Sequence, residues 1–314
     1  ALSQIVPAHR GGRFMSGSHL HHEKRERYPL MGIPPTYLSV LICVLIVAAA
    51  LRFYGLSNAE NTDEYNEIFE ALRVASGKFN VNRWHKKGFQ NLLAIEYGVY
   101  FVVGYLAGLW RSTMDFAATI ISGLQPLFLI GRYTTAAMGT VSVFLVYWIG
   151  CRLYNPRVGL VASAFLAGCT MHVWTSHLVN TDIPLTFFFL LSLVFIVRFV
   201  SSGARWDYCL AAVFSAVTFN IKIMGVGILV IYGLAHLQKR LREGWTIVQA
   251  LTDKHLRYAA LCFVGGLLVS NPAIVVGFKQ WLMYFVWQYG IYTNVYEEVP
   301  YAMNDTGFYT YAIL

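Results

Sequence analysis

Long apolar stretches that recur along the chain constrain its fold more than any other feature. A helix needs about twenty apolar residues to cross a bilayer, and soluble cores do not need such runs. Only 13% of the residues are charged, where a soluble domain carries about 25%. The sequence therefore predicts an all-α, polytopic transmembrane protein. About seven spans are expected, over 36–56, 133–150, 158–176, 183–200, 208–221, 223–237 and 255–270.

The net charge of +8 comes from basic residues gathered in short segments between the apolar runs. Such segments are typical of cytoplasmic loops, so the charge indicates membrane orientation and not a nucleic-acid partner. We place 151–157, 198–205 and 239–257 inside. Residues 1–35 are polar and basic, and they predict a cytoplasmic leader. Residues 36–270 form the transmembrane module, and 271–314 are predicted to be an external aromatic loop that leads into a further helix.

Two more apolar stretches, 92–109 and 117–130, must both cross the membrane or both lie at its surface. The leader and the 151–157 loop are placed on the same side of the membrane, so an even number of spans must separate them. Two are already assigned, at 36–56 and 133–150, so the two further stretches add either two spans or none. Glu96 and the aromatic-rich pattern favour interfacial helices in the first external loop. Arg52, near the end of the first span, is expected to snorkel to the interface.

The segment after the first span carries the adjacent carboxylates Asp63 and Glu64. Residues 63–77 predict a short helix, because acids occupy its first turn and Gly77 follows its last. Its apolar face is expected to comprise Tyr65, Ile68, Phe69, Leu72 and Ala75.

The predicted topology brings further polar groups to the same external face. They are His85, Lys86, Lys87, Asp182, Lys222 and Asn271. The acidic pair and these groups also have structural alternatives: Asp63 can favour a helix N-terminus, Asp182 can cap the helix that follows it, and Lys222 can snorkel. The basic segment His85, Lys86 and Lys87 can consist of solvated interfacial residues. His177 lies near Asp182, but no cluster of ligands demands a metal. We assign no metal ligand and require no cofactor, and a divalent metal remains an alternative.

The order of these motifs resembles the GT-C glycosyltransferases. The acidic pair comes first, a His-Lys-Lys segment follows, and the block from Arg132 to Phe195 contains SHLVNTDIPLTFFFLLSLVF. A lone lysine between two helices comes last. The closest likeness is to the family 39 and aminoarabinose-transferase-like branch, relatives of the protein O-mannosyltransferases, over residues 36–314. The resemblance implies a GT-C fold with interfacial helices in the first external loop.

The resemblance also implies an activity and residue roles. Such enzymes take a sugar from a polyprenyl-phosphate carrier on the external side, with inversion. Asp63 falls on the presumed general base, Glu64 on the second member of the acidic pair, and Asp182 on the acid of a later external loop. Lys222 falls on the lysine assigned to the lipid phosphate. The His85, Lys86 and Lys87 segment falls on a His motif of the first loop, although the prolines usual there are missing.

The leading hypothesis is therefore a polyprenyl-phosphate-sugar-dependent glycosyltransferase in a bacterial inner membrane, with its active site on the periplasmic side. Its partners would be the lipid-linked donor, membrane lipids, and a lipid, glycan or protein acceptor. One alternative is a catalytically silent GT-C-like subunit of a membrane protein complex. A transporter is a further alternative, but the polar groups gather at one surface and not at the midplane.

Overall fold

All regular elements in the described part of the chain are helices, which confirms the predicted all-α fold. The structure is a computed structural model, and it describes residues 35–58, 62–77, 87–279 and 281–283. The helices are α2 (Pro35–Phe53), α3 (Thr62–Ala75), α4 (Lys87–Leu106), α5 (Thr113–Ser122), α6 (Gln125–Leu153), α7 (Pro156–Gly168), α8 (Thr170–Ser176), α9 (Asp182–Ser202), α10 (Arg205–Ile221), α11 (Gly227–Arg242), α12 (Ile247–Leu251), α13 (Lys254–Ser270) and α14 (Ala273–Val276), with 3-10 turns η1 (Leu56–Asn58) and η3 (Ile223–Val226).

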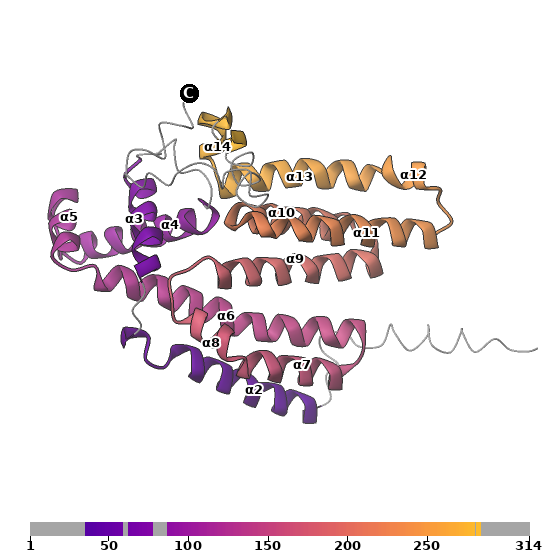
Figure 1. Cartoon of the computed structure of the whole chain (residues 1–314), viewed down its shortest axis with the longest axis horizontal. Coiled ribbons are helices and arrows are strands. Elements are labelled where there is room, and N and C mark those ends of the chain that lie inside the picture. Colours follow the sequence, from indigo (N-terminus) through magenta and orange to yellow (C-terminus); the bar gives the residue numbers. More distant parts are fainter. Residues whose placement is uncertain (1–34, 59–61, 78–86, 280, 284–314) are drawn as a thin grey trace, which may run out of the picture.

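The long helices form a bundle with distinct ends. Figure 1 shows α2, α6, α7, α9, α10, α11 and α13 running along a common direction. Helices α3, α4 and α5 gather at one end, called the α3 end here, and α12 lies at the opposite end, called the α12 end. Within the bundle, α10 packs against both α9 and α13, while α6 packs against α2, α7 and α9.

Two described helices, α6 and α9, are long and apolar enough to cross a membrane. The pair α7 and α8 makes a third span if it is counted as one helix bent by 60°. Every predicted span coincides with a helix or helix pair. However, α10, α11 and α13 have 17, 16 and 17 residues, so each is about 25 Å long, slightly short of the hydrocarbon core.

The segment between α2 and α6 differs from its prediction at one boundary. The sequence treated 117–130 as one apolar stretch, and this is wrong: the stretch is divided between two helices. Gly123 ends α5 in an extended conformation, and α6 begins at Gln125 with Pro126 in its first turn. Proline suits that position because its fixed φ is helical and it lacks an N–H that would go unpaired. Arg132 consequently lies inside α6.

Helices α6 and α7 approach each other at a pair of glycines. A β-carbon added to Gly150 would lie 2.6 Å from the Cα of Gly159. Small residues allow membrane helices to pack at such short range. The connection is correspondingly short, because α6 continues to Leu153 and the Asn155 side chain caps α7 by accepting from the Val158 amide at 3.0 Å.

A buried apolar cluster holds the helices of the α3 end onto the bundle. It draws side chains from α3, α4, α6, α10 and the segment before α9, and its members include Ile68, Phe89, Leu93, Leu127, Val179 and Ile221. All six are fully buried. This cluster fixes the position of α3 and of the start of α4, which carry several of the predicted site residues.

Candidate active site

Helix α3 presents a different face to the protein than its apolar pattern predicts. Its buried residues are Glu64, Ile68 and Ala71, which are spaced four and three residues apart. Tyr65 and Phe69, expected to be buried, are 46% and 47% exposed. The predicted buried face of α3 was therefore wrong by about one position. Glu64 lies on the buried side because its carboxylate binds a buried partner. The neighbouring Asp63 is exposed.

That buried partner is Arg132 of α6. Its Nε donates to Glu64 Oε1 at 2.9 Å, and its Nη2 donates to Oε2 at 2.7 Å. The two side chains are 4% and 1% exposed. Such two-point contact fixes both position and orientation of a carboxylate. The ion pair therefore anchors the first turn of α3, and with it the backbone of Asp63.

Backbone groups complete this anchor. The Val179 amide, three residues before α9, donates to Glu64 Oε1 at 2.8 Å, and Arg132 Nη1 donates to the Leu56 carbonyl at 2.8 Å. The pair thus joins η1, the start of α3, α6 and the segment before α9. In this structure the Glu64 carboxylate is occupied by Arg132 and the Val179 amide, and a direct catalytic role for it stays a prediction.

Asp182 and Lys222 form an ion pair at the same end of the bundle. Asp182 is the first residue of α9, Lys222 directly follows α10, and Lys222 Nζ lies 2.7 Å from Asp182 Oδ1. Both side chains reach solvent, at 52% and 32% exposure. The capping alternative for Asp182 is not observed, because Thr181 is the N-cap residue and no side-chain hydrogen bond caps α9.

Of the predicted basic segment, only Lys87 is described, since His85 and Lys86 lie outside the described residues. Lys87 opens α4, is 4% exposed, and donates to Glu70 Oε2 at 2.7 Å. Its charge is therefore neutralised within the protein. The next residue, Gly88, packs against the end of α10: a β-carbon there would lie 3.0 Å from the Ile221 amide nitrogen.

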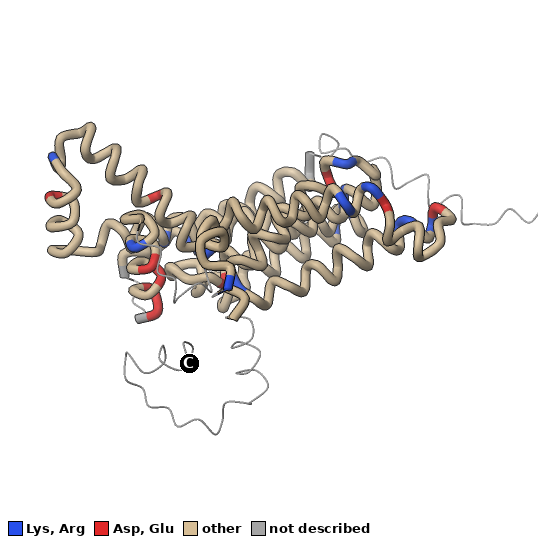
Figure 2. The backbone as a smooth tube through the Cα atoms, turned by 90° about the horizontal axis from the view of Figure 1, so that it is seen from above, with Lys and Arg blue, Asp and Glu red and all other residues tan. Residues whose placement is uncertain are grey.

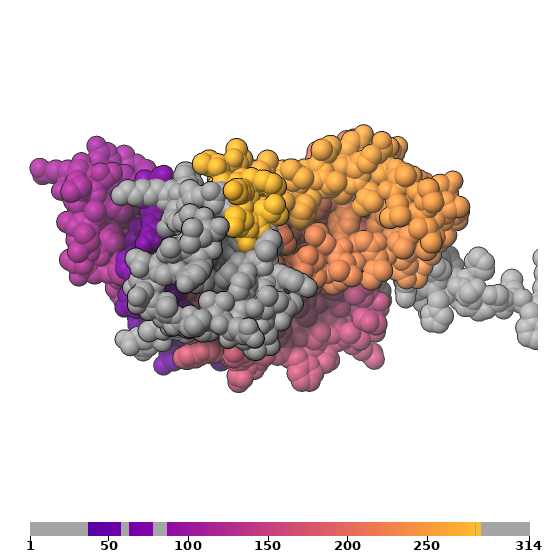
Figure 3. Space-filling view, turned by 45° about the horizontal axis from the view of Figure 1, so that its top comes forward, coloured from indigo at the N-terminus to yellow at the C-terminus, as the bar shows by residue number. Residues whose placement is uncertain are grey.

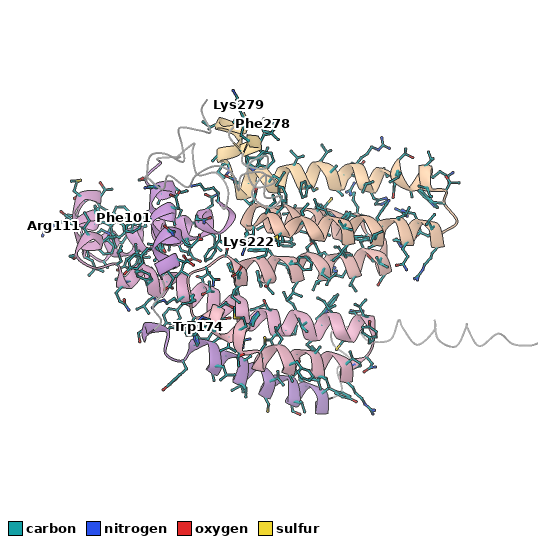
Figure 4. The ribbon with its side chains drawn as sticks, viewed as in Figure 1. Phe101, Arg111, Trp174, Lys222, Phe278 and Lys279 are labelled. Atoms are coloured by element: carbon teal, nitrogen blue, oxygen red, sulfur yellow. The ribbon has the colours of Figure 1, made fainter. Side chains whose placement is uncertain are left out.

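These contacts bring most of the predicted residues to the α3 end. Figure 4 shows Lys222 where the start of α9 and the end of α10 approach the start of α4. Figure 2 shows the acidic residues of α3 at the same end of the bundle. Asn271 lies at the end of α13 and is 1% exposed, and its Oδ1 has no hydrogen-bond partner among the described residues. The adjacent Ser270 carbonyl accepts from Asn91 Nδ2 at 2.6 Å, which joins α13 to α4.

Sequence reasoning did not include Arg132 among the site residues. The predicted span began at 133, so it did not include this arginine. The signal was available, because a lone arginine within an apolar helix needs a buried partner.

Arg52 was misjudged in a similar way. It does not snorkel: it is fully buried and donates to the carbonyls of Ala48, Leu166 and Ala167. The last two belong to the final turn of α7, whose carbonyls have no partner within the helix. Arg52 thus supports the break between α7 and α8.

No group of three or more His, Cys, Asp or Glu side chains that could hold a metal ion is found within the described ranges. His177, the metal candidate considered from the sequence, instead places Nε2 2.8 Å from the Leu51 carbonyl. The absence of a metal requirement stays a prediction.

Comparison with known proteins points to a class of enzyme. Residues 128–253 match the family described as dolichyl-phosphate-mannose-protein mannosyltransferase. The matched part runs from α6 to the residue before α13, so it contains Arg132, Asp182 and Lys222 but not the acids of α3. No curated protein matches the chain. Together with the apolar helices, the family match supports a membrane glycosyltransferase that uses a lipid-linked sugar.

Proposed function

We propose that the protein is an inverting glycosyltransferase of the GT-C class, in the family 39 and aminoarabinose-transferase-like branch. It would transfer a sugar from a polyprenyl-phosphate carrier to an acceptor at the α3 end, on the external face of the membrane. The observation that carries this proposal is the pairing of Asp182 with Lys222 at 2.7 Å, at the end of the bundle where Arg132 holds Glu64 of α3. Sugar transfer from a phosphate ester needs a carboxylate to accept the proton of the acceptor and a cation to stabilise the leaving phosphate. Both kinds of group lie at this end of the bundle.

The chemistry is a single displacement. An acceptor hydroxyl attacks the anomeric carbon, and Asp63 takes its proton as the new C–O bond forms; such base catalysis typically contributes about 10²–10⁴-fold. The bond from the anomeric carbon to the phosphate oxygen breaks, and polyprenyl phosphate leaves. Lys222 would stabilise the negative charge that develops on this leaving group.

The anchored Glu64 supports the base by fixing its helix. Asp63 is adjacent to Glu64, whose carboxylate is bound on both oxygens. A preorganised base needs a support of this kind, because an error of about 1 Å in its position is costly to the rate. Asp182 would hold Lys222 until the donor phosphate arrives.

The test measures transfer from a panel of radiolabelled polyprenyl-phosphate sugars by the detergent-purified protein. Asp63→Asn should abolish transfer while leaving the unfolding transition unchanged. Asp115→Asn is the matched control, because Asp115 is also an exposed acid in the first turn of a helix. Its transfer rate should equal that of the unaltered protein.

Two results would refute the proposal. The first is undiminished transfer by Asp63→Asn, which removes the assigned base. The second is silence across the whole panel from a folded protein, which favours the catalytically silent subunit.

A further inference from the structure

Helix α12, at the α12 end of the bundle, exposes apolar side chains on the surface. Within α12, Ile247, Val248 and Leu251 are 57%, 71% and 61% exposed, and Ala250 is buried. Figures 1 and 3 place this segment at the extreme end of the molecule, on its surface. An exposed apolar group of this kind marks a contact with a membrane or a partner.

Exposed cations surround this end. They come from the end of α6 and the starts of α7, α10 and α13, together with the last residue of α11: Arg152, Arg157, Arg205, Arg242, Lys254 and Arg257. None of the six forms an ion pair with a carboxylate in the described part of the chain. Figure 2 shows the basic residues concentrated here.

The acids at this end are already neutralised by other residues. Asp207 pairs with Arg198 at 2.9 Å. Asp253 pairs with Arg240, and Glu243 accepts from Lys239 at 2.9 Å as well as from Arg240 at 2.6 Å. The outer cations therefore face the surroundings with their charge uncompensated.

The aromatic residues at this end are of the types that favour a membrane surface. Trp206 is 70% exposed and Tyr258 is 42% exposed. The Arg205 guanidinium carbon lies 5.8 Å and 5.6 Å from the centres of these two rings. Tryptophan and tyrosine favour the headgroup region, where an apolar ring and a polar edge are both accommodated.

We propose that the α12 end binds the headgroups of anionic phospholipids, with α12 lying at the boundary between headgroups and acyl chains. Cations supply the attraction to the phosphate groups, and the apolar side chains of α12 supply burial, as in interfacial helices. The site is separate from the proposed donor site, because Lys222 lies near the opposite end (Figure 4). It does not depend on the proposed transferase activity.

The test uses the purified chain in neutral detergent, titrated with dansyl-labelled phosphatidylglycerol or phosphatidylcholine, with energy transfer from tryptophan as the readout. The unaltered protein should bind phosphatidylglycerol more tightly, and added salt should remove the difference. The triple variant Arg205→Gln, Lys254→Gln, Arg257→Gln should lose roughly a hundredfold of that affinity, at about fivefold per cation. Its affinity for phosphatidylcholine should not change.

The matched control is Arg111→Gln with Lys279→Gln. Both are exposed cations away from the α12 end, as Figure 4 shows, and their removal should leave the lipid preference intact. Val248→Ser with Leu251→Ser should weaken binding of both lipids alike. Equal affinity of the unaltered protein for the two lipids would overturn the proposal, and so would an equal loss in the control pair.

Discussion

Removing one member of the buried ion pair between Glu64 and Arg132 should be one of the more destabilising single changes in this protein. Replacing Arg132 by Met preserves an unbranched side chain but removes the charge and three hydrogen bonds, two to Glu64 and one to the Leu56 carbonyl. The Glu64 carboxylate then stays buried at 1% exposure, with only the Val179 amide as a described partner. Breaking a buried pair by removing one member costs about 3–5 kcal/mol.

Equilibrium unfolding in mixed detergent micelles measures this cost. Arg152→Met is the matched control, because Arg152 lies on the same helix but is exposed and forms no ion pair in the described structure. It should lose less than about 1 kcal/mol. Adding Glu64→Gln to Arg132→Met should recover about 1–3 kcal/mol, since the unpaired charge is then gone. A loss below about 1 kcal/mol for Arg132→Met, or strict additivity in the double variant, would refute the reasoning.

Three other predictions concern the donor, the pH and the helix packing. Lys222→Gln should weaken binding of a polyprenyl-phosphate sugar by about tenfold, the equivalent of about 1.4 kcal/mol, in a competition assay where Lys279→Gln has no effect. Burial alone would raise the pKa of Asp253, but hydrogen bonds from His255 and Arg240 together hold that pKa below its ordinary value of 3.8. A lowered pKa stabilises the fold above pH 3.8, and this stability is lost as the pH falls further, so Asp253→Asn should flatten the loss of stability measured below about pH 4. Gly150→Leu should cost about 1–3 kcal/mol in thermal unfolding, whereas Gly233→Leu should not, because nothing lies within 4 Å of a β-carbon at Gly233.

The length of the apolar runs was sufficient to predict the long helices of the bundle. Each expected span coincides with a helix or helix pair, because a run of apolar residues bounded by basic residues has few other structures available in a membrane. The boundary near 117–130 was missed because a short turn at Gly123 interrupts the run without changing its hydropathy.

The site was predicted in part. Asp182 and Lys222 were assigned to one face from topology, and they form an ion pair. The internal partners of Glu64 and Lys87 could not be predicted, since they depend on which side of α3 and α4 faces the bundle. That orientation is set by Arg132 and Glu70, which are far from their partners in the sequence. Local periodicity contains no information on such distant pairs.

The pairing of Asp182 with Lys222 changes what anion binding at this lysine means. The ammonium group already has a counter-ion at 2.7 Å, so in the proposed mechanism a donor phosphate would compete with the Asp182 carboxylate for this lysine. Its binding free energy would be the difference between two attractions and not the whole of one. Such an exchange would favour ligands that offer more oxygen atoms than the carboxylate they displace. It would also release Asp182, so that occupancy of the lysine and availability of a free carboxylate would become a single event.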